Sequence, residues 1–193
     1  MVLDWTICSE KVKTNHLEGY KVPFKNGLVG CFIRNGNLLV YNKDEKEFYE
    51  VSEQKGVQQK IKIVDPKHKL KNTDIFTGEN ILMAETKNSN LVISSSNKTV
   101  VIADKHGTIL EAFERQGAFF RGIAVDNYGQ ILVADYQNDF IDILSEDGVF
   151  QRNLLNNENK DRIIYSTFHI TIDEWGLLWV FNEENTMKMF SYQ

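Results

Sequence analysis

Short apolar segments alternate with turns rich in Asp, Asn and Gly along most of the chain, and the pattern is clearest in residues 117–155. The sequence there is GAFFRGIAVDNYGQILVADYQNDFIDILSEDGVFQRNLL. Its apolar segments are Gly122–Asp126, Gln130–Ala134, Asp139–Leu144 and Val149–Leu154. Segments of this length joined by such turns predict a four-stranded antiparallel sheet. One such sheet has two faces to bury, so the pattern predicts further copies.

Three weaker copies of this pattern are present. HITIDEWGLLWV, which begins at His169, aligns with RGIAVDNYGQILV, and the other two copies are CFIRNGNLLVYNKDEKEFYEV and ILMAETKNSNLVISSSNKTVVIADKHGTILEAF. The equivalent positions in the four copies are 53, 40 and 47 residues apart: Val40, Ile93, Val133 and Val180. Four-stranded antiparallel units that repeat every ~40–50 residues predict an all-β fold, a β-propeller.

The best copy, GIAVDNYGQILVADYQNDFIDIL, resembles an NHL repeat, whose usual form is roughly P-x-G-I-A-V-D-x-x-G-N-I-Y-V-A-D-x-x-N-x-R-I-Q-V-F. The matching residues are Gly122, Ile123, Ala124, Val125, Asp126, Gly129, Val133, Ala134, Asp135 and Asn138. Phe120 stands at the family's proline and Phe140 at a commonly basic position. The ending MKMFSYQ resembles the last strand of propellers in tripartite-motif (TRIM) ubiquitin ligases. The resemblance covers about Leu28 to Gln193 and implies a six-bladed propeller, of which this chain holds about four NHL-type blades.

The repeats predict the domain organisation. Residues 1–26 form an N-terminal strand segment or a partial blade, and residues 27–193 form blades at approximately 27–65, 79–114, 117–155 and 166–193. The last blade lacks an outer strand. Three arrangements remain open: Trp5–Cys8 completes that blade and the ring tightens to four, two chains pair end to end, or the chain is a fragment that needs upstream blades. We expect an incomplete ring that self-associates through its open blade faces or is poorly soluble.

Composition adds limits on the function. Apolar residues make up 42% and charged residues 25% of the 193 residues, as in an ordinary globular domain. The net charge of −5 argues against general affinity for nucleic acid and leaves a local basic patch possible. The first residues do not form a secretory signal, and no segment approaches the ~20 apolar residues of a membrane span. Cys8 and Cys31 do not form a disulfide framework, so we expect a cytoplasmic protein without membrane contact.

Aspartates at the strand ends are the first candidates for chemistry. Asp126 and Asp173 occupy equivalent positions before glycine-containing turns, where an Asp side chain bonds the backbone two residues on. We therefore predict a turn role instead of a metal site, and the same holds for Asp104 and Asp135. The four histidines lack the spacing of a zinc site. We expect neither a cofactor nor a bound metal.

Basic residues are the second set of candidates. The segment 55–71 is lysine-rich and ends in Lys67, Lys69 and Lys71, which indicates a phosphate or RNA contact. The competing interpretation, which we favour, is a solvated outer strand in which Lys60 and Lys62 discourage edge pairing.

The resemblance supplies a third set, because in NHL domains the loops after the second and fourth strands form the recognition face. Here these loops carry Arg115, Arg121, Tyr136 and Arg162, together with acidic residues that include Glu183. Arg121 and Tyr136 are the strongest candidates, since arginine and tyrosine are common interface anchors. The alternative is that both fill space beside the central channel. We expect Trp175 and Trp179 to be packing residues.

These observations predict a non-enzymatic interaction module, similar to the recognition domains of TRIM-like proteins, that binds a protein or RNA. The net charge and the mixed face favour a protein partner. The alternative is an enzyme, because other six-bladed propellers that resemble NHL units are metal-dependent lactonases or lyases. Such enzymes need polar ligands on several inner strands. The inner strands here, LVGCFI, ILMAE, GIAVD and HITID, are mainly apolar, which disfavours the alternative.

Overall fold

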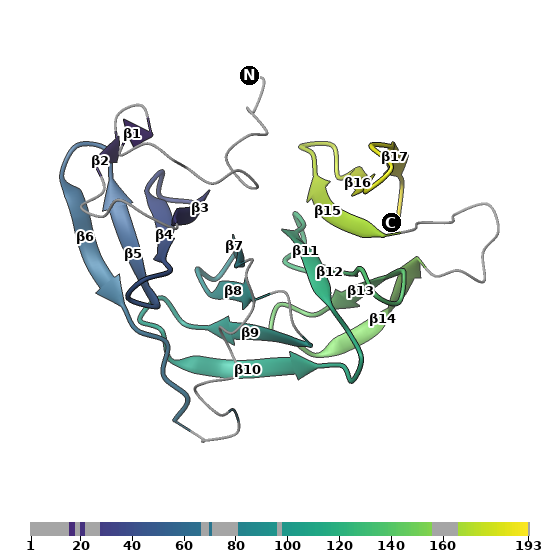
Figure 1. Ribbon diagram of the computed structural model, residues 1–193, viewed down its shortest axis with the longest axis horizontal. Coiled ribbons are helices and arrows are strands. Elements are labelled where there is room, and N and C mark those ends of the chain that lie inside the picture. Colours follow the sequence, from purple (N-terminus) through teal and green to yellow (C-terminus); the bar gives the residue numbers. More distant parts are fainter. Residues whose placement is uncertain are drawn as a thin grey trace.

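Four antiparallel sheets form an arc in the computed structural model (Figure 1). The structure describes residues 16–17, 20–21, 28–66, 70, 81–95, 98–155 and 166–192. Within these ranges the regular elements are all strands, so the predicted all-β class is confirmed. Three sheets have four strands and the last has three, in the order β3-β4-β5-β6, β7-β8-β9-β10, β11-β12-β13-β14 and β15-β16-β17. This is the architecture of a partial propeller, and each sheet is called a blade below.

The strand bounds follow the repeated pattern. Blade 1 contains β3 (Leu28–Phe32), β4 (Leu38–Asn42), β5 (Glu47–Ser52) and β6 (Gly56–Ile61). Blade 2 contains β7 (Leu82–Glu85), β8 (Leu91–Ser94), β9 (Thr99–Ala103) and β10 (Ile109–Glu114). Blade 3 contains β11 (Phe120–Val125), β12 (Ile131–Asp135), β13 (Phe140–Leu144) and β14 (Phe150–Leu155). Blade 4 contains β15 (Thr167–Ile172), β16 (Leu178–Asn182) and β17 (Met187–Phe190).

The predicted alignment of the copies is confirmed by the second strand of each blade. Val40, Ile93, Val133 and Val180 are each the third residue of β4, β8, β12 and β16, respectively, and none is more than 3% exposed. Successive side chains in a strand point to opposite faces, so each second strand supplies both neighbouring layers of the core. Val133 packs towards blade 2, while Leu132 packs towards blade 4.

Blades 3 and 4 approach closely where β11 and β15 run side by side. A methyl group added at Gly122 would lie 3.1 Å from the backbone N of Ile170 and 3.2 Å from the Cβ of Ala134. Ile123, its neighbour, is 9% exposed and lies in the layer towards blade 2. Glycine at position 122 therefore permits the contact between the two inner strands.

The outer strand of blade 1 ends before the predicted limit of that blade at residue 65. β6 ends at Ile61, and Val64 instead forms a parallel bridge with Thr108 of blade 2. The N–H of Val64 donates to the carbonyl of Gly107 at 2.9 Å. Gly107 has a φ of +92°, and a Cβ there would lie 2.3 Å from the carbonyl oxygen of Lys62. Glycine at position 107 therefore lets the turn of blade 2 pack closely against the backbone that follows β6.

The N-terminal segment is described only in part. β1 (His16–Leu17) and β2 (Tyr20–Lys21) form a small hairpin, and β2 contacts β5 and β6 of blade 1. The predicted strand Trp5–Cys8 lies outside the described residues. No helix in the described ranges is long and apolar enough to cross a membrane.

Candidate interaction surface

Aspartates organise the turns at one edge of the blades. The carboxylate of Asp126 accepts from the N–H groups of Tyr128 and Gln130, both at 2.8 Å. Asp173 and Asp104 accept from their own turns in the same way. The predicted turn role is therefore confirmed. Among the described residues, no group of three or more His, Cys, Asp or Glu side chains is placed to hold a metal ion.

Asp135 organises the opposite edge of blade 3. This side chain is fully buried and its Oδ1 accepts from the N–H groups of Phe119, Gln137 and Asn138, each at 3.2 Å. The N–H of Tyr136 in turn donates to the carbonyl of Phe119 at 3.0 Å. These bonds join the connection before β11 to the turn after β12. As a result, the rings of Phe119 and Tyr136 meet edge to face, 6.2 Å apart.

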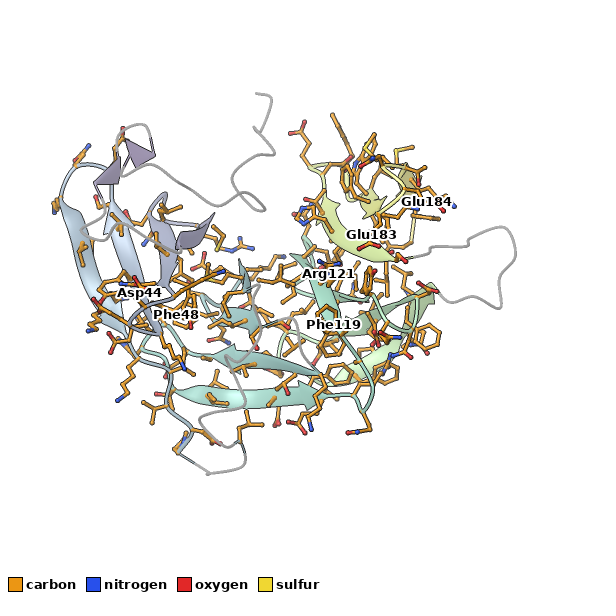
Figure 2. The ribbon with its side chains drawn as sticks, in the orientation of Figure 1. Asp44, Phe48, Phe119, Arg121, Glu183 and Glu184 are labelled. Carbon is orange, nitrogen blue, oxygen red and sulfur yellow. The ribbon has the colours of Figure 1, made fainter. Side chains whose placement is uncertain are left out.

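Arg121 completes this site together with a residue of blade 4. Its guanidinium lies 4.8 Å from the ring centroid of Tyr136 and 5.8 Å from that of Phe119. Its Nη1 also lies 3.1 Å from the Oε1 of Glu183. The hydroxyl of Tyr136 donates to the other carboxylate oxygen, Oε2, at 2.8 Å. We call Phe119, Arg121, Tyr136 and Glu183 the Arg121 cluster, three members of which are labelled in Figure 2.

Glu183 is positioned by the turn between β16 and β17. The side chain of Asn182 accepts from the N–H groups of Glu184 and Thr186, at 3.1 and 2.9 Å. The N–H of Glu183 donates to the carbonyl of Ser166, and the N–H of Ser166 donates to the carboxylate of Asp139 in blade 3. The cluster therefore spans two blades and is fixed on both sides.

The cluster remains partly open to solvent. Phe119 is 38% exposed, and the side chains of Arg121 and Glu183 are 28% and 50% exposed. A partner could therefore contact an aromatic ring, a guanidinium edge and a carboxylate at one place. The structure brings together Arg121 and Tyr136, the two strongest candidates from the sequence. Phe119 was missed, although it lies directly before β11 in a connection after a fourth strand.

Arg115 occupies a different environment from Arg121. Its guanidinium lies 2.7 Å from the Oδ2 of Asp142, which is fully buried in β13. Three phenylalanine rings surround it with centroids 5.6–5.7 Å away: Phe113, Phe140 and Phe150. Burial raises the pKa of Asp142 to about 6, although Arg115 and a hydrogen bond from Asn153 oppose this shift. Arg115 follows β10, so this ion pair joins blades 2 and 3.

The remaining candidates lie elsewhere. Lys67, Lys69, Lys71 and Arg162 are outside the described residues, so their proposed contacts stay predictions. Lys60, the fifth of six residues in β6, pairs with Glu45 at 3.4 Å and with Glu47, and its side chain is 51% exposed.

The packing role predicted for Trp175 is wrong. This residue is 76% exposed because it lies in the Asp173 turn and contributes its backbone N–H to that turn. Trp179 is half-buried, and its indole N–H donates to the carboxylate of Asp173 at 2.8 Å.

Comparisons with known proteins identify the fold. No protein-family model and no curated protein matches the chain. Solved structures do match, among them virginiamycin B lyase from Staphylococcus aureus, with a TM-score of 0.61 and 13% identity over 89% of this chain and 58% of that one. A streptogramin B lyase gives 0.60, with 13% identity over 89% and 57% of the two chains. The WD40 propeller domain of Doa1 gives 0.59, with 16% identity over 84% and 49%.

These similarities establish a β-propeller and not a particular function. The chain spans a little over half the length of the lyases that it matches. Because the similar structures include both an enzyme and a WD40 propeller domain, and identity is low, the shared feature is the fold. The finer resemblance to NHL repeats of TRIM proteins is not confirmed.

Proposed function

We propose that this chain is a non-enzymatic interaction module that binds a protein partner through the Arg121 cluster. The observation that supports this proposal is the joint exposure of Phe119, Arg121 and Tyr136 beside Glu183 on the edge formed by loops after the second and fourth strands. Arginine and aromatic side chains are enriched among residues that dominate binding energy. Their ordering before binding also lowers the entropy cost of association.

The charge around the cluster favours a protein over RNA. Arg121 is already paired with Glu183, and Glu184 beside it is exposed. Asp44, in the corresponding turn of blade 1, is also exposed. Exposed carboxylates repel a polyanion, and binding to phosphates needs an excess of cations. A polypeptide with basic or hydrogen-bonding side chains fits this surface better.

The proposed role, recognition of a protein partner inside the cell, is the one that the resemblance to recognition domains of TRIM-like proteins suggests. The loops that carry the Arg121 cluster belong to two neighbouring blades, 3 and 4.

Affinity capture with the purified chain tests the proposal. Wild type is compared with Arg121→Ala and Tyr136→Ala, and captured proteins are quantified with and without ribonuclease. The matched control is Tyr128→Ala, because Tyr128 is a 66% exposed tyrosine in the β11–β12 turn, at the other end of these strands. We expect a protein that Tyr128→Ala retains and that both cluster variants lose, whether or not RNA is digested.

Two results would contradict the proposal. Capture that ribonuclease abolishes would identify RNA as the ligand. Capture that survives Arg121→Ala and Tyr136→Ala would place the binding surface elsewhere.

A further inference from the structure

Glu183 occupies the Arg121 cluster in the way that a bound ligand would. Its Oε1 lies 3.1 Å from Nη1 of Arg121, and its Oε2 accepts from the hydroxyl of Tyr136 at 2.8 Å. These two donors belong to blade 3, whereas the carboxylate comes from the turn after β16 in blade 4 (Figure 2). Blade 3 therefore presents a site for a carboxylate, and the chain fills that site with its own side chain.

The blade 3 part of this site is held without help from Glu183. The carboxylate of Asp135 accepts from the backbone of Phe119 and from the turn that carries Tyr136. The guanidinium of Arg121 lies 4.8 Å from the ring centroid of Tyr136, and guanidinium groups stack on aromatic faces. We therefore expect Arg121 and Tyr136 to keep their places when Glu183 leaves.

Glu183 is also bound weakly enough to be displaced. Its side chain is 50% exposed, and exposed ion pairs contribute little free energy because water screens the two charges. The side chain of Asn182 and the backbone form the turn, so the turn does not need the Glu183 carboxylate. The carboxylate can therefore move into solvent while the turn stays in place.

Arg121 has unused N–H groups for an incoming carboxylate. A guanidinium carries five N–H groups, and in the described part of the chain Arg121 donates one hydrogen bond, to Glu183. Glu183 uses its other oxygen for Tyr136. A carboxylate from outside the chain could accept two parallel N–H groups from Arg121, which is the stronger arrangement.

We propose that an acidic side chain of the protein partner, Glu or Asp, displaces Glu183 and binds Arg121 and Tyr136. The inference rests on the proposed function and names the chemistry of the partner. This partner offers an exposed carboxylate next to an apolar side chain, which contacts the 38% exposed ring of Phe119. Glu183 is then an autoinhibitory residue. One carboxylate replaces another at Arg121, whereas a polyanion brings further charges towards Glu184, which is exposed.

Selection from a library of displayed random peptides tests this inference. Peptides that the wild-type chain retains and that Arg121→Ala loses should contain Glu or Asp beside an apolar residue. Synthesised with both ends blocked, these peptides should bind Glu183→Ala about two- to sixfold more tightly than wild type, because a weak ion pair closes the site for only part of the time. The same peptides with Gln for Glu, or Asn for Asp, should bind more weakly to both proteins.

The matched control is Glu184→Ala. This variant removes the same charge from the same turn, but Glu184 is not a member of the Arg121 cluster. It should therefore raise the affinity less than Glu183→Ala does. Glu183 and Glu184 are both exposed, so both variants should keep the wild-type circular dichroism spectrum.

Three results would overturn the inference. The first is an affinity that Glu183→Ala leaves unchanged or lowers, and a lower affinity would mean that Glu183 itself contacts the partner. The second is an equal gain in Glu183→Ala and Glu184→Ala, which would indicate a general effect of charge. The third is a selection without peptides that depend on Arg121, or one whose Arg121-dependent peptides share no acidic residue. Affinity capture tests the proposed function separately, since a partner lost by both cluster variants supports that function even where the peptide results exclude a carboxylate.

Discussion

Arg115 and Arg121 are six positions apart, and each pairs with a carboxylate of the next blade, but the two pairs differ in burial and surroundings. Arg115 pairs with Asp142, which is 0% exposed, within a group of three phenylalanine rings. Arg121 pairs with Glu183, which is 50% exposed, and stacks on Tyr136. Both pairs bridge neighbouring blades. Only the second leaves a guanidinium and a carboxylate within reach of a partner.

The difference shows how burial separates a structural residue from a binding residue. A buried charge has lost its hydration, so removal of its partner leaves an uncompensated ion. An exposed pair is hydrated on both sides, and its loss changes stability little. We therefore assign Arg115 to the fold and Arg121 to the proposed surface, and the following predictions test that assignment.

The largest expected effect is on Arg115. Replacement by alanine leaves Asp142 buried without its cation, and we expect the free energy of unfolding to fall by about 3 kcal/mol. Urea denaturation followed by fluorescence measures the change. Replacing both partners, as Arg115→Met with Asp142→Leu, should recover most of the loss because the buried charge is gone. If Arg115→Ala is as stable as wild type, the pair does not hold the two blades together.

The pH dependence of Asp142 sharpens the same contrast. Its pKa is raised to about 6, mainly by burial, above the unfolded value of 3.8. The folded state therefore binds more protons than the unfolded state between these values, and the contribution of this group to stability falls as pH rises through that window. Relative to Asp142→Asn, wild type should lose on the order of 2 kcal/mol of unfolding free energy between pH 4 and pH 7.

Denaturation of both proteins across this range tests the sign. A wild type that gains stability relative to Asp142→Asn as pH rises would show that attraction to Arg115 outweighs the loss of hydration. In that case the Arg115 pair would resemble an ordinary salt bridge, and its contrast with the Arg121 pair would be weaker.

The smallest expected effect on stability is at Arg121. Because Glu183 is half exposed, Arg121→Ala should change the free energy of unfolding by only about 0.2–1 kcal/mol. A double-mutant cycle with Glu183→Gln should give a coupling energy in the same range, and added salt should reduce it. A coupling as large as that expected for the Arg115 pair would mean that the cluster is structural.

Sequence periodicity was sufficient to predict the propeller. The second strand of each blade could be aligned because a strand buried on both faces is a short apolar segment between turns. The aligned residues are Val40, Ile93, Val133 and Val180. The turn roles of Asp126 and Asp173 were also predictable, since the bonds involved are local.

The sequence pattern could not show that Arg115 is enclosed between blades while Arg121 is exposed. The environment of Arg115 depends on Asp142 and on the ring of Phe150, and the environment of Arg121 depends on Glu183, 62 positions away. Such contacts follow from the packing of blades and leave no local pattern. Trp175 was expected to pack because it is a large aromatic residue. It is exposed because the Asp173 turn uses only the backbone N–H of Trp175 and leaves its side chain in solvent.

The central claim is that Arg121 serves binding and not folding, and one measurement on Arg121→Ala tests it most directly. The free energy of unfolding and the capture of the protein partner are determined on the same preparation, beside wild type and Tyr128→Ala. We predict that Arg121→Ala unfolds within about 1 kcal/mol of wild type and no longer captures the partner. A variant that captures the partner as wild type does, or that loses capture only because it has unfolded, would contradict this account.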